Sequence, residues 1–164
     1  MTDPSAAGGA ALTASVLPRA DGTPFAFDTN TQGVAMERIA INPTSFSVGL
    51  GFDQALLITG RRRELICSAQ DSVDETGTPV HPGDLAAQLA KSLDNLEAVL
   101  AEAQMALSDV VRLNIFTTEL STLFRHFSAI TDRFNGSRFA TTVLGVPSLA
   151  GPDLMVALEA TAMD

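Results

Sequence analysis

Tryptophan and tyrosine are absent from this chain of 164 residues, so phenylalanine supplies every aromatic side chain. Positive charge is also scarce: 10 Lys and Arg residues stand against 19 Asp and Glu residues, which gives a formal net charge of −9. A nucleic-acid binder needs cations that displace phosphate counterions, and usually flat rings that stack on bases. The one basic cluster, Arg61-Arg62-Arg63, lies between two apolar runs and precedes Glu64, which favours a solvated hairpin turn over a phosphate site. We therefore expect no nucleic-acid partner.

Cysteine and long apolar runs are lacking too. The single cysteine, Cys67, cannot form an internal disulfide, and a reducing cytoplasm is its natural compartment. No apolar run approaches the ~18 residues of a membrane span. Residues 1–35 lack the basic start and the continuous apolar stretch of a signal peptide. We therefore expect a cytoplasmic protein with no membrane partner.

Residue types that hold metals or cofactors are few. The two histidines, His81 and His126, are far apart in the sequence, and the chain has neither an HExxH motif nor a pair of cysteines. A GxSxG elbow and a phosphate-binding glycine loop are missing as well. The sequence therefore indicates no metal site and no nucleophilic serine of this kind.

Hydrophobic residues make up 46% of the chain, enough to bury the core of one domain. Residues 1–35 are rich in Ala, Gly, Thr, Pro and Asp and show no sustained periodicity. We predict that they form an N-terminal extension that is flexible or lies on the surface. The patterned domain begins at Met36 and comprises residues 36–164.

Apolar residues at steps of three and four predict two helices. The first covers residues 84–104, and Asp84 suits its positive N-terminal end. The second runs from Ser121, a suitable N-cap, to Phe134, and Asn135-Gly136 would end it. Strands are predicted at residues 55–59, 64–68, 110–118, 141–146 and 154–162. The first two would form a hairpin about residues 60–62, and the last two would form a pair.

The order strands, helix, strand, helix, strands is typical of an α+β fold with both helices on one face of a sheet. On the last strand, Ala157, Glu159 and Thr161 project to the side opposite Val156 and Leu158. The sheet face away from the helices would therefore be mildly apolar, and such a face is often buried in an oligomer.

Two chemically interesting residues leave alternatives open. Cys67 ends an expected buried strand, where a free cysteine is usually a small hydrophobic residue, although a reactive thiol is the other possibility. Glu159 interrupts an apolar strand, and an ionised carboxylate there needs a partner, which Arg138 or Arg112 could supply. The alternative to this structural ion pair is a catalytic base. The acidic segment at residues 70–81 is interpreted as a solvated loop.

Six short strings follow one another along the chain: CSAQ at 67–70, GDLAAQ at 83–88, LDNL at 93–96, DVVRL at 109–113, TT at 117–118 and VALEA at 156–160. Together they resemble the Rid (YjgF) family, the reactive intermediate deaminases, over about residues 36–164. The resemblance implies a chorismate-mutase-like α+β fold and a homotrimer with a barrel-like core and small-molecule clefts between subunits. The best-known members hydrolyse imines and enamines such as 2-aminoacrylate to a keto acid and ammonia, without metal or cofactor.

The family's pattern implies which residues surround the cleft, and it shows two departures. Thr141 replaces the arginine that holds the substrate carboxylate, a difference of about 2–4 kcal/mol in binding. Ala157 replaces the glutamate that orients the attacking water, whereas Glu159 matches the second glutamate. Arg138 lies an odd number of residues before Thr141, so it would reach the cleft only if the strand began with a bulge. The candidate ligand-binding residues are Phe52, Ser68, Ala69, Ser128, Arg138, Thr141, Val143 and Glu159.

Three functions follow from the resemblance. The first is a trimeric protein that binds or transforms a neutral or apolar metabolite, with no ordinary 2-aminoacrylate deaminase activity; it resembles the branch of the family that lacks the arginine. The second is an imine or enamine deaminase that uses Arg138 or takes an uncharged substrate. The third is a ribonuclease, which the negative charge and the absence of Trp and Tyr oppose. No catalytic residue is assigned.

Overall fold

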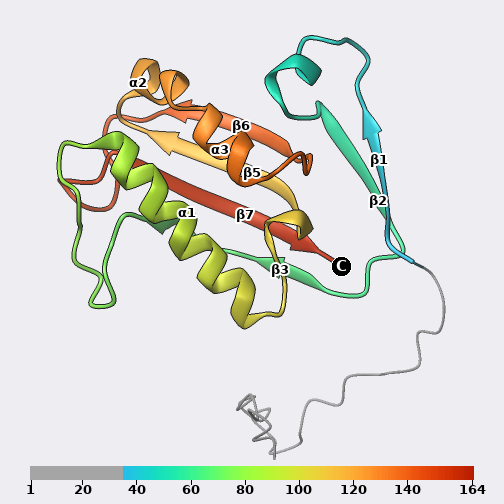
Figure 1. Cartoon of the computed structure of the whole chain (residues 1–164), viewed down its shortest axis with the longest axis horizontal. Helices are drawn as coiled ribbons and strands as arrows, with labels where there is room; N and C mark the ends of the chain where they lie inside the picture. The colour runs from blue at the N-terminus through green and yellow to red at the C-terminus, as the bar shows by residue number, and fades with distance from the viewer. Residues whose placement is uncertain (1–34) are drawn as a thin grey trace, which may run out of the picture. The chain divides into compact units, whose positions relative to one another are not determined.

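The computed structural model describes residues 35–164, and this range contains seven strands and three α-helices (Figure 1). The predicted N-terminal extension lies outside the described residues, apart from Ala35. None of the helices in this range is both long and apolar enough to cross a membrane.

The strands form two sheets. β1 (Glu37–Ile41) and β2 (Ala55–Thr59) pair antiparallel with each other. The larger sheet has the order β3-β7-β5-β6, with β4 also paired to β7. Within it, β5 runs parallel to β6 and antiparallel to β7. The strands of this sheet are β3 (Glu64–Ile66), β4 (Gln70–Asp71), β5 (Val110–Thr117), β6 (Ala140–Gly145) and β7 (Val156–Met163).

All five predicted strands are present, but two predicted pairings are wrong. β2 pairs with β1 and β3 pairs with β7, so the expected hairpin between β2 and β3 does not form. The turn between them is instead held by the C-terminal residue, because the amides of Arg62 and Arg63 donate to the Asp164 carbonyl at 2.5 and 3.1 Å. β6 and β7 are separated by β5. The position of a strand can be predicted from its apolar run. Its neighbour in the sheet cannot, because pairing depends on tertiary packing.

The predicted helix at residues 84–104 is confirmed as α1 (Leu85–Glu102). Asp84 is its N-cap, and its carboxylate accepts a hydrogen bond from the Ala87 amide at 3.0 Å. The helix contacts β7 and β4 through a stripe of leucines that are each 3% exposed or less: Leu85, Leu89, Leu93, Leu96 and Leu100. This stripe is one wall of the hydrophobic core.

The predicted second helix is wrong as a single element. It is two short helices, α2 (Leu120–Arg125) and α3 (Ser128–Arg133), and Glu119 rather than Ser121 precedes the first. The break at residues 126–127 keeps both Leu123 and Ile130 fully buried. Asn135 and Gly136 end α3 with positive φ, as expected.

The large sheet buries one face under the helices (Figure 1). On β5, the buried side chains of Leu113 and Ile115 alternate with exposed Arg112 and half-buried Asn114. All three helices contribute to the same core as β5 and β7. The opposite face carries exposed apolar side chains, among them Ile66 at 76% exposed.

Candidate functional site

An apolar cavity of about 530 Å³ lies where the loop before β2 meets α2, the junction between α2 and α3, and β6. No charged side chain lines it. Three phenylalanines converge there from different parts of the chain, and the rings of Phe124 and Phe127 lie 6.3 Å apart. The lining residues are Leu50, Phe52, Phe124, Phe127, Thr141 and Val143. The structure therefore brings together three of the expected cleft residues, Phe52, Thr141 and Val143.

The floor of this cavity is the outer strand of the sheet, β6. Half-buried Thr141 and Val143 alternate with exposed Thr142 and Leu144, so the first two face the cavity. The Thr141 hydroxyl donates a 2.7 Å hydrogen bond to the Leu113 carbonyl of β5. Because its proton is committed to the backbone, Thr141 presents a methyl group and an acceptor oxygen, and offers no donor to a ligand.

The opposite wall is the loop that carries the short 3₁₀ helix Val48–Leu50. Gly51 ends this helix with φ +89°, a conformation that side chains with a Cβ rarely adopt. The Asp53 amide then donates to the Phe139 carbonyl at 3.0 Å, which joins the loop to the segment just before β6. Gly51 and Asp53 therefore fix the position of Phe52 between them.

Behind Phe52 lies an ion pair that the sequence did not predict, in which the carboxylate is buried and the arginine side chain is 35% exposed. Asp53 is 1% exposed, and its Oδ1 accepts from Arg138 Nε at 2.8 Å and from Asn42 Nδ2 at 2.7 Å. Arg138 Nη2 also donates to the Phe52 carbonyl at 2.7 Å. Burial, the largest single influence, raises the pKa of Asp53, but the hydrogen bonds from Arg138 and Asn42 and the Arg138 charge together hold that pKa below its usual range.

This pairing corrects the expectation for Glu159. Its carboxylate receives one long hydrogen bond, 3.5 Å from Asn114 Nδ2, and no cation of residues 35–164 lies within salt-bridge distance of it. Arg138 is paired with Asp53, and Arg112 donates to the Asn114 side chain at 3.2 Å. Arg138 is thus placed behind a wall of the apolar cavity and does not line it.

The remaining expected residues lie elsewhere on the chain. Ala69 and Glu159 line a smaller cavity of about 270 Å³, together with Asp71, Phe116 and Ala157. Burial raises the pKa of Asp71, and its Oδ1 is enclosed without a hydrogen-bond partner within the described residues. Ser68 and Ser128 are exposed and line neither cavity.

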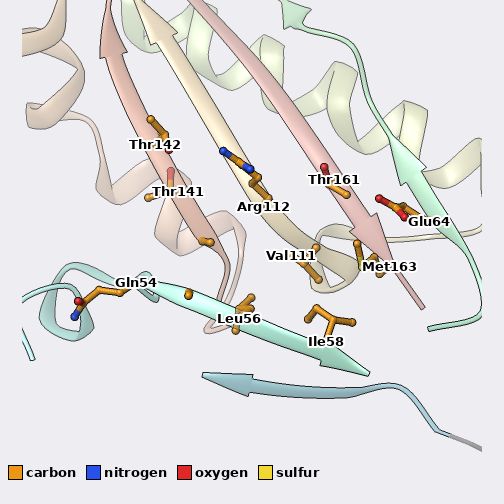
Figure 2. Close-up of a pocket in the computed structure, with 12 residues that line it drawn as sticks. Gln54, Leu56, Ile58, Glu64, Val111, Arg112, Thr141, Thr142, Thr161 and Met163 are labelled. Atoms are coloured by element: carbon orange, nitrogen blue, oxygen red, sulfur yellow. The ribbon is translucent and has the colours of Figure 1, made fainter. Parts of the chain in front are cut away.

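A third cavity, of about 500 Å³, lies between β2 and the sheet face away from the helices (Figure 2). Figure 2 shows Leu56 and Ile58 on β2 facing the sheet, which presents Arg112 and Thr161. Of the expected cleft residues, this cavity includes Thr141 alone. The apolar cavity gathers more of them, so we take it as the candidate ligand site.

Cys67 is 6% exposed and belongs to the hydrophobic core, which confirms the interpretation of this residue as a small hydrophobic side chain. Desolvation raises the pKa of its thiol, which disfavours the reactive thiolate. Among residues 35–164, no three His, Cys, Asp or Glu side chains come together as metal ligands.

Sequence reasoning missed three lining residues, Leu50, Phe124 and Phe127, and the Asp53 partner of Arg138. In a continuous helix over residues 121–134, the apolar spacing puts Phe127 on the buried face with Leu123, Ile130 and Phe134, and puts Phe124 outside it. The break between α2 and α3 determines where both rings lie, and the spacing of apolar residues does not reveal such a break. Asp53 is 85 residues from Arg138, too far for any local pattern to link them.

Residues 51–164 match the family model described as endoribonuclease L-PSP. Protein DfrA of Myxococcus xanthus is 30% identical over 115 residues, which are 70% of this chain and 87% of that protein. A RutC family protein of Pyrococcus abyssi is 24% identical over 98 residues, 60% of this chain and 76% of that protein. The crystal structure of YyfB from Yersinia pestis, a Rid-family protein of unknown function, is 32% identical with a TM-score of 0.70, over 77% of this chain and 98% of that one.

Proposed function

Because the chain belongs to the endoribonuclease L-PSP family, whose members are also called YjgF or Rid proteins, we propose that it binds a small molecule in the apolar cavity and that this ligand is neutral and largely apolar. One observation carries the proposal: the cavity is walled by three phenylalanines, and no charged side chain lines it. Apolar cavities with few polar groups are the usual form of small-molecule sites.

The polar groups of the site agree with this ligand class. The Thr141 hydroxyl proton is used by the Leu113 carbonyl, and the Arg138 charge is paired with Asp53. A carboxylate placed in the cavity would therefore lose its hydration without gaining a charged partner. A neutral ligand that buries about 150 Å² of apolar surface gains about 4 kcal/mol from that burial, which offsets part of the cost of association.

The absence of tryptophan and tyrosine allows a direct binding test. In the variant Phe124→Trp, excitation of tryptophan reports on the cavity alone, and Val48→Trp, exposed and outside the lining, serves as the matched control. Titration with benzamide should change Phe124→Trp emission saturably, with a weaker response to benzoate and none in the control. Adding Val143→Phe, which narrows the cavity, should weaken the response. A stronger response to benzoate, or equal responses of both reporters, would contradict the proposal.

We also propose the homotrimer of the family, with clefts between subunits. The sheet face away from the helices carries exposed apolar side chains on two strands, namely Ile66 on β3 and Leu144 on β6, and burying them would stabilise an assembly. In such a trimer, the apolar cavity of one subunit would lie next to the Ala69–Glu159 cavity of another. Sedimentation equilibrium should give three times the monomer mass, and a monomer at micromolar concentration would refute the assembly.

Hydrolysis of an uncharged imine or enamine is the second candidate function, and Asp71 is the observation that favours it. β4 pairs with β7 so that Asp71 lies opposite Ala157, and both residues line one cavity. A carboxyl group with a raised pKa and no partner suits proton transfer. A coupled assay that generates carboxylate-free imines, by oxidation of a panel of primary amines, tests this candidate: any acceleration of imine hydrolysis should be lost in Asp71→Asn and kept in Glu75→Gln. No acceleration is expected with 2-aminoacrylate.

A further inference from the structure

A positive charge lies directly behind one wall of the apolar cavity. The Arg138 guanidinium donates from Nη2 to the carbonyl of Phe52, whose side chain lines the cavity. The Arg138 side chain is 35% exposed, so solvent screens part of its charge. The part of its field that crosses the Phe52 wall would attract an anion. The cavity would then favour a carboxylate ligand, unless another group cancelled the charge.

Asp53 is the group that cancels it. Its Oδ1 lies 2.8 Å from both Nε and Nη2 of Arg138, and the carboxylate is 1% exposed. Asn42 holds the same oxygen at 2.7 Å. Burying a carboxylate is unfavourable in itself. Its presence beside Arg138 leaves no net charge behind the Phe52 wall.

We propose that Asp53 determines the ligand class of the cavity: by neutralising Arg138 it makes the site select neutral ligands, and without its charge the site would accept carboxylates. This inference rests on the proposed function, because it assumes that a ligand occupies the apolar cavity. Asp53 is a positioning and charge-balancing residue and does not line the cavity.

A purely structural role for the pair makes a different prediction. The pair also joins the loop before β2 to the segment before β6, so its loss would move Phe52 and weaken every ligand alike. A role through charge changes the ratio of two affinities instead. Asp53→Asn separates the two roles, since the amide oxygen still accepts from Arg138 and Asn42 while the negative charge is gone.

The experiment uses the full chain carrying the Phe124→Trp reporter, with benzoate and benzamide as an isosteric pair of ligands. The parent should bind benzamide more tightly. Asp53→Asn should raise the ratio of benzoate to benzamide affinity about tenfold, an effect that weakens at high salt. Arg138→Gln and the double variant Asp53→Asn/Arg138→Gln should not raise the ratio. Asp132→Asn removes one exposed charge from α3 and should leave the ratio unchanged.

Each result has a definite meaning. Equal weakening of both ligands in Asp53→Asn, or an equal rise in the ratio in Asp132→Asn, would overturn the inference and leave the proposed function standing. If the parent binds neither ligand but Asp53→Asn binds benzoate, the neutral ligand class is refuted, and only the second half of the inference, that Asp53 excludes carboxylates, is supported. If neither ligand binds any variant, both proposals fail. Should Asp53→Asn not fold, a raised ratio in folded Arg138→Gln would by itself overturn the inference.

Discussion

Gly51 offers the sharpest test of how the wall of the apolar cavity is built. Its φ is +89°, and a Cβ placed on it would lie 2.8 Å from Cγ2 of Thr131 on α3. The variant Gly51→Ala therefore meets two separate penalties, one in its own backbone and one against a neighbouring helix. Both act on the residue that immediately precedes Phe52.

The size of each penalty follows from the geometry. An alanine at positive φ costs about 1 kcal/mol relative to glycine. A contact of 2.8 Å is well inside the normal separation of two carbon atoms, and relieving such overpacking costs about 1–3 kcal/mol. The residues just before Gly51 in this loop are mostly exposed and can shift, so we expect a total of about 2–3 kcal/mol. For a domain of this size the fall in Tm is about 8–12 °C.

Thermal and urea unfolding of a double-mutant cycle measures the two parts separately. Thr131→Ser removes Cγ2 and keeps the hydroxyl that donates to the Ser128 carbonyl at 3.1 Å. In that background Gly51→Ala should cost only the backbone part, about 1 kcal/mol. Gly49→Ala is the matched control in the same turn, because nothing lies within 4 Å of its Cβ position. An equal cost of Gly51→Ala in both backgrounds would refute the contact, and a cost like that of Gly49→Ala would refute the left-handed turn.

Three further predictions concern other parts of the chain. Asp84→Ala should destabilise the protein by about 1 kcal/mol in urea unfolding because α1 loses its N-cap. Asp84→Asn keeps a capping side chain and should be nearly as stable as the parent. The stability that ionised Asp53 contributes should be full above its unfolded pKa of about 3.9 and lost as the pH falls through its lower folded-state pKa. Between pH 6 and pH 3, the free energy of unfolding should therefore fall more steeply in the parent than in Asp53→Asn. Cys67 should react with a thiol reagent at the rate of unfolding rather than at once.

Hydrophobic periodicity predicted the elements of this fold better than their neighbours. The stripe of α1 and the alternation along β5 depend on local geometry, so they could be found without knowing any tertiary contact. The partner of β2 depends on β1, whose exposed and half-buried residues show no clear alternation. The insertion of β5 between β6 and β7 is a property of the whole sheet. No local pattern distinguishes it from a hairpin.

The division of the second helix shows a similar limit. The spacing of one continuous helix is shared by Leu123, Phe127, Ile130 and Phe134. The helix is nevertheless interrupted at His126 and Phe127. The break places the ring of Phe127 beside Phe124 at the cavity while Phe134 packs against Phe139, with ring centroids 4.3 Å apart. Propensity is too weak to oppose such tertiary contacts in a segment of this length.

For the candidate site, the resemblance to the family predicted which residues surround the cleft. The structure showed which of them are charged, paired or buried. Phe52, Thr141 and Val143 were placed together from motifs alone, and the structure brings them to one cavity. The resemblance also left Arg138 as a candidate replacement for the arginine that it implies at position 141. Its hydrogen bonds to Asp53 and to the Phe52 carbonyl place it behind the wall.

Under the proposed function, Thr141 and Asp53 act together. Thr141 adds no positive charge to the lining, but Arg138 would supply one nearby if Asp53 were neutral. On this proposal the cavity selects neutral ligands only with both residues in place, and Asp53 acts through a contact across 85 residues. It follows that Thr141→Arg and Asp53→Asn should shift ligand preference in the same direction, toward carboxylates. If Thr141→Arg alone changed the preference, the charge of Arg138 would not reach the cavity, and the ligand class would be set by β6 alone.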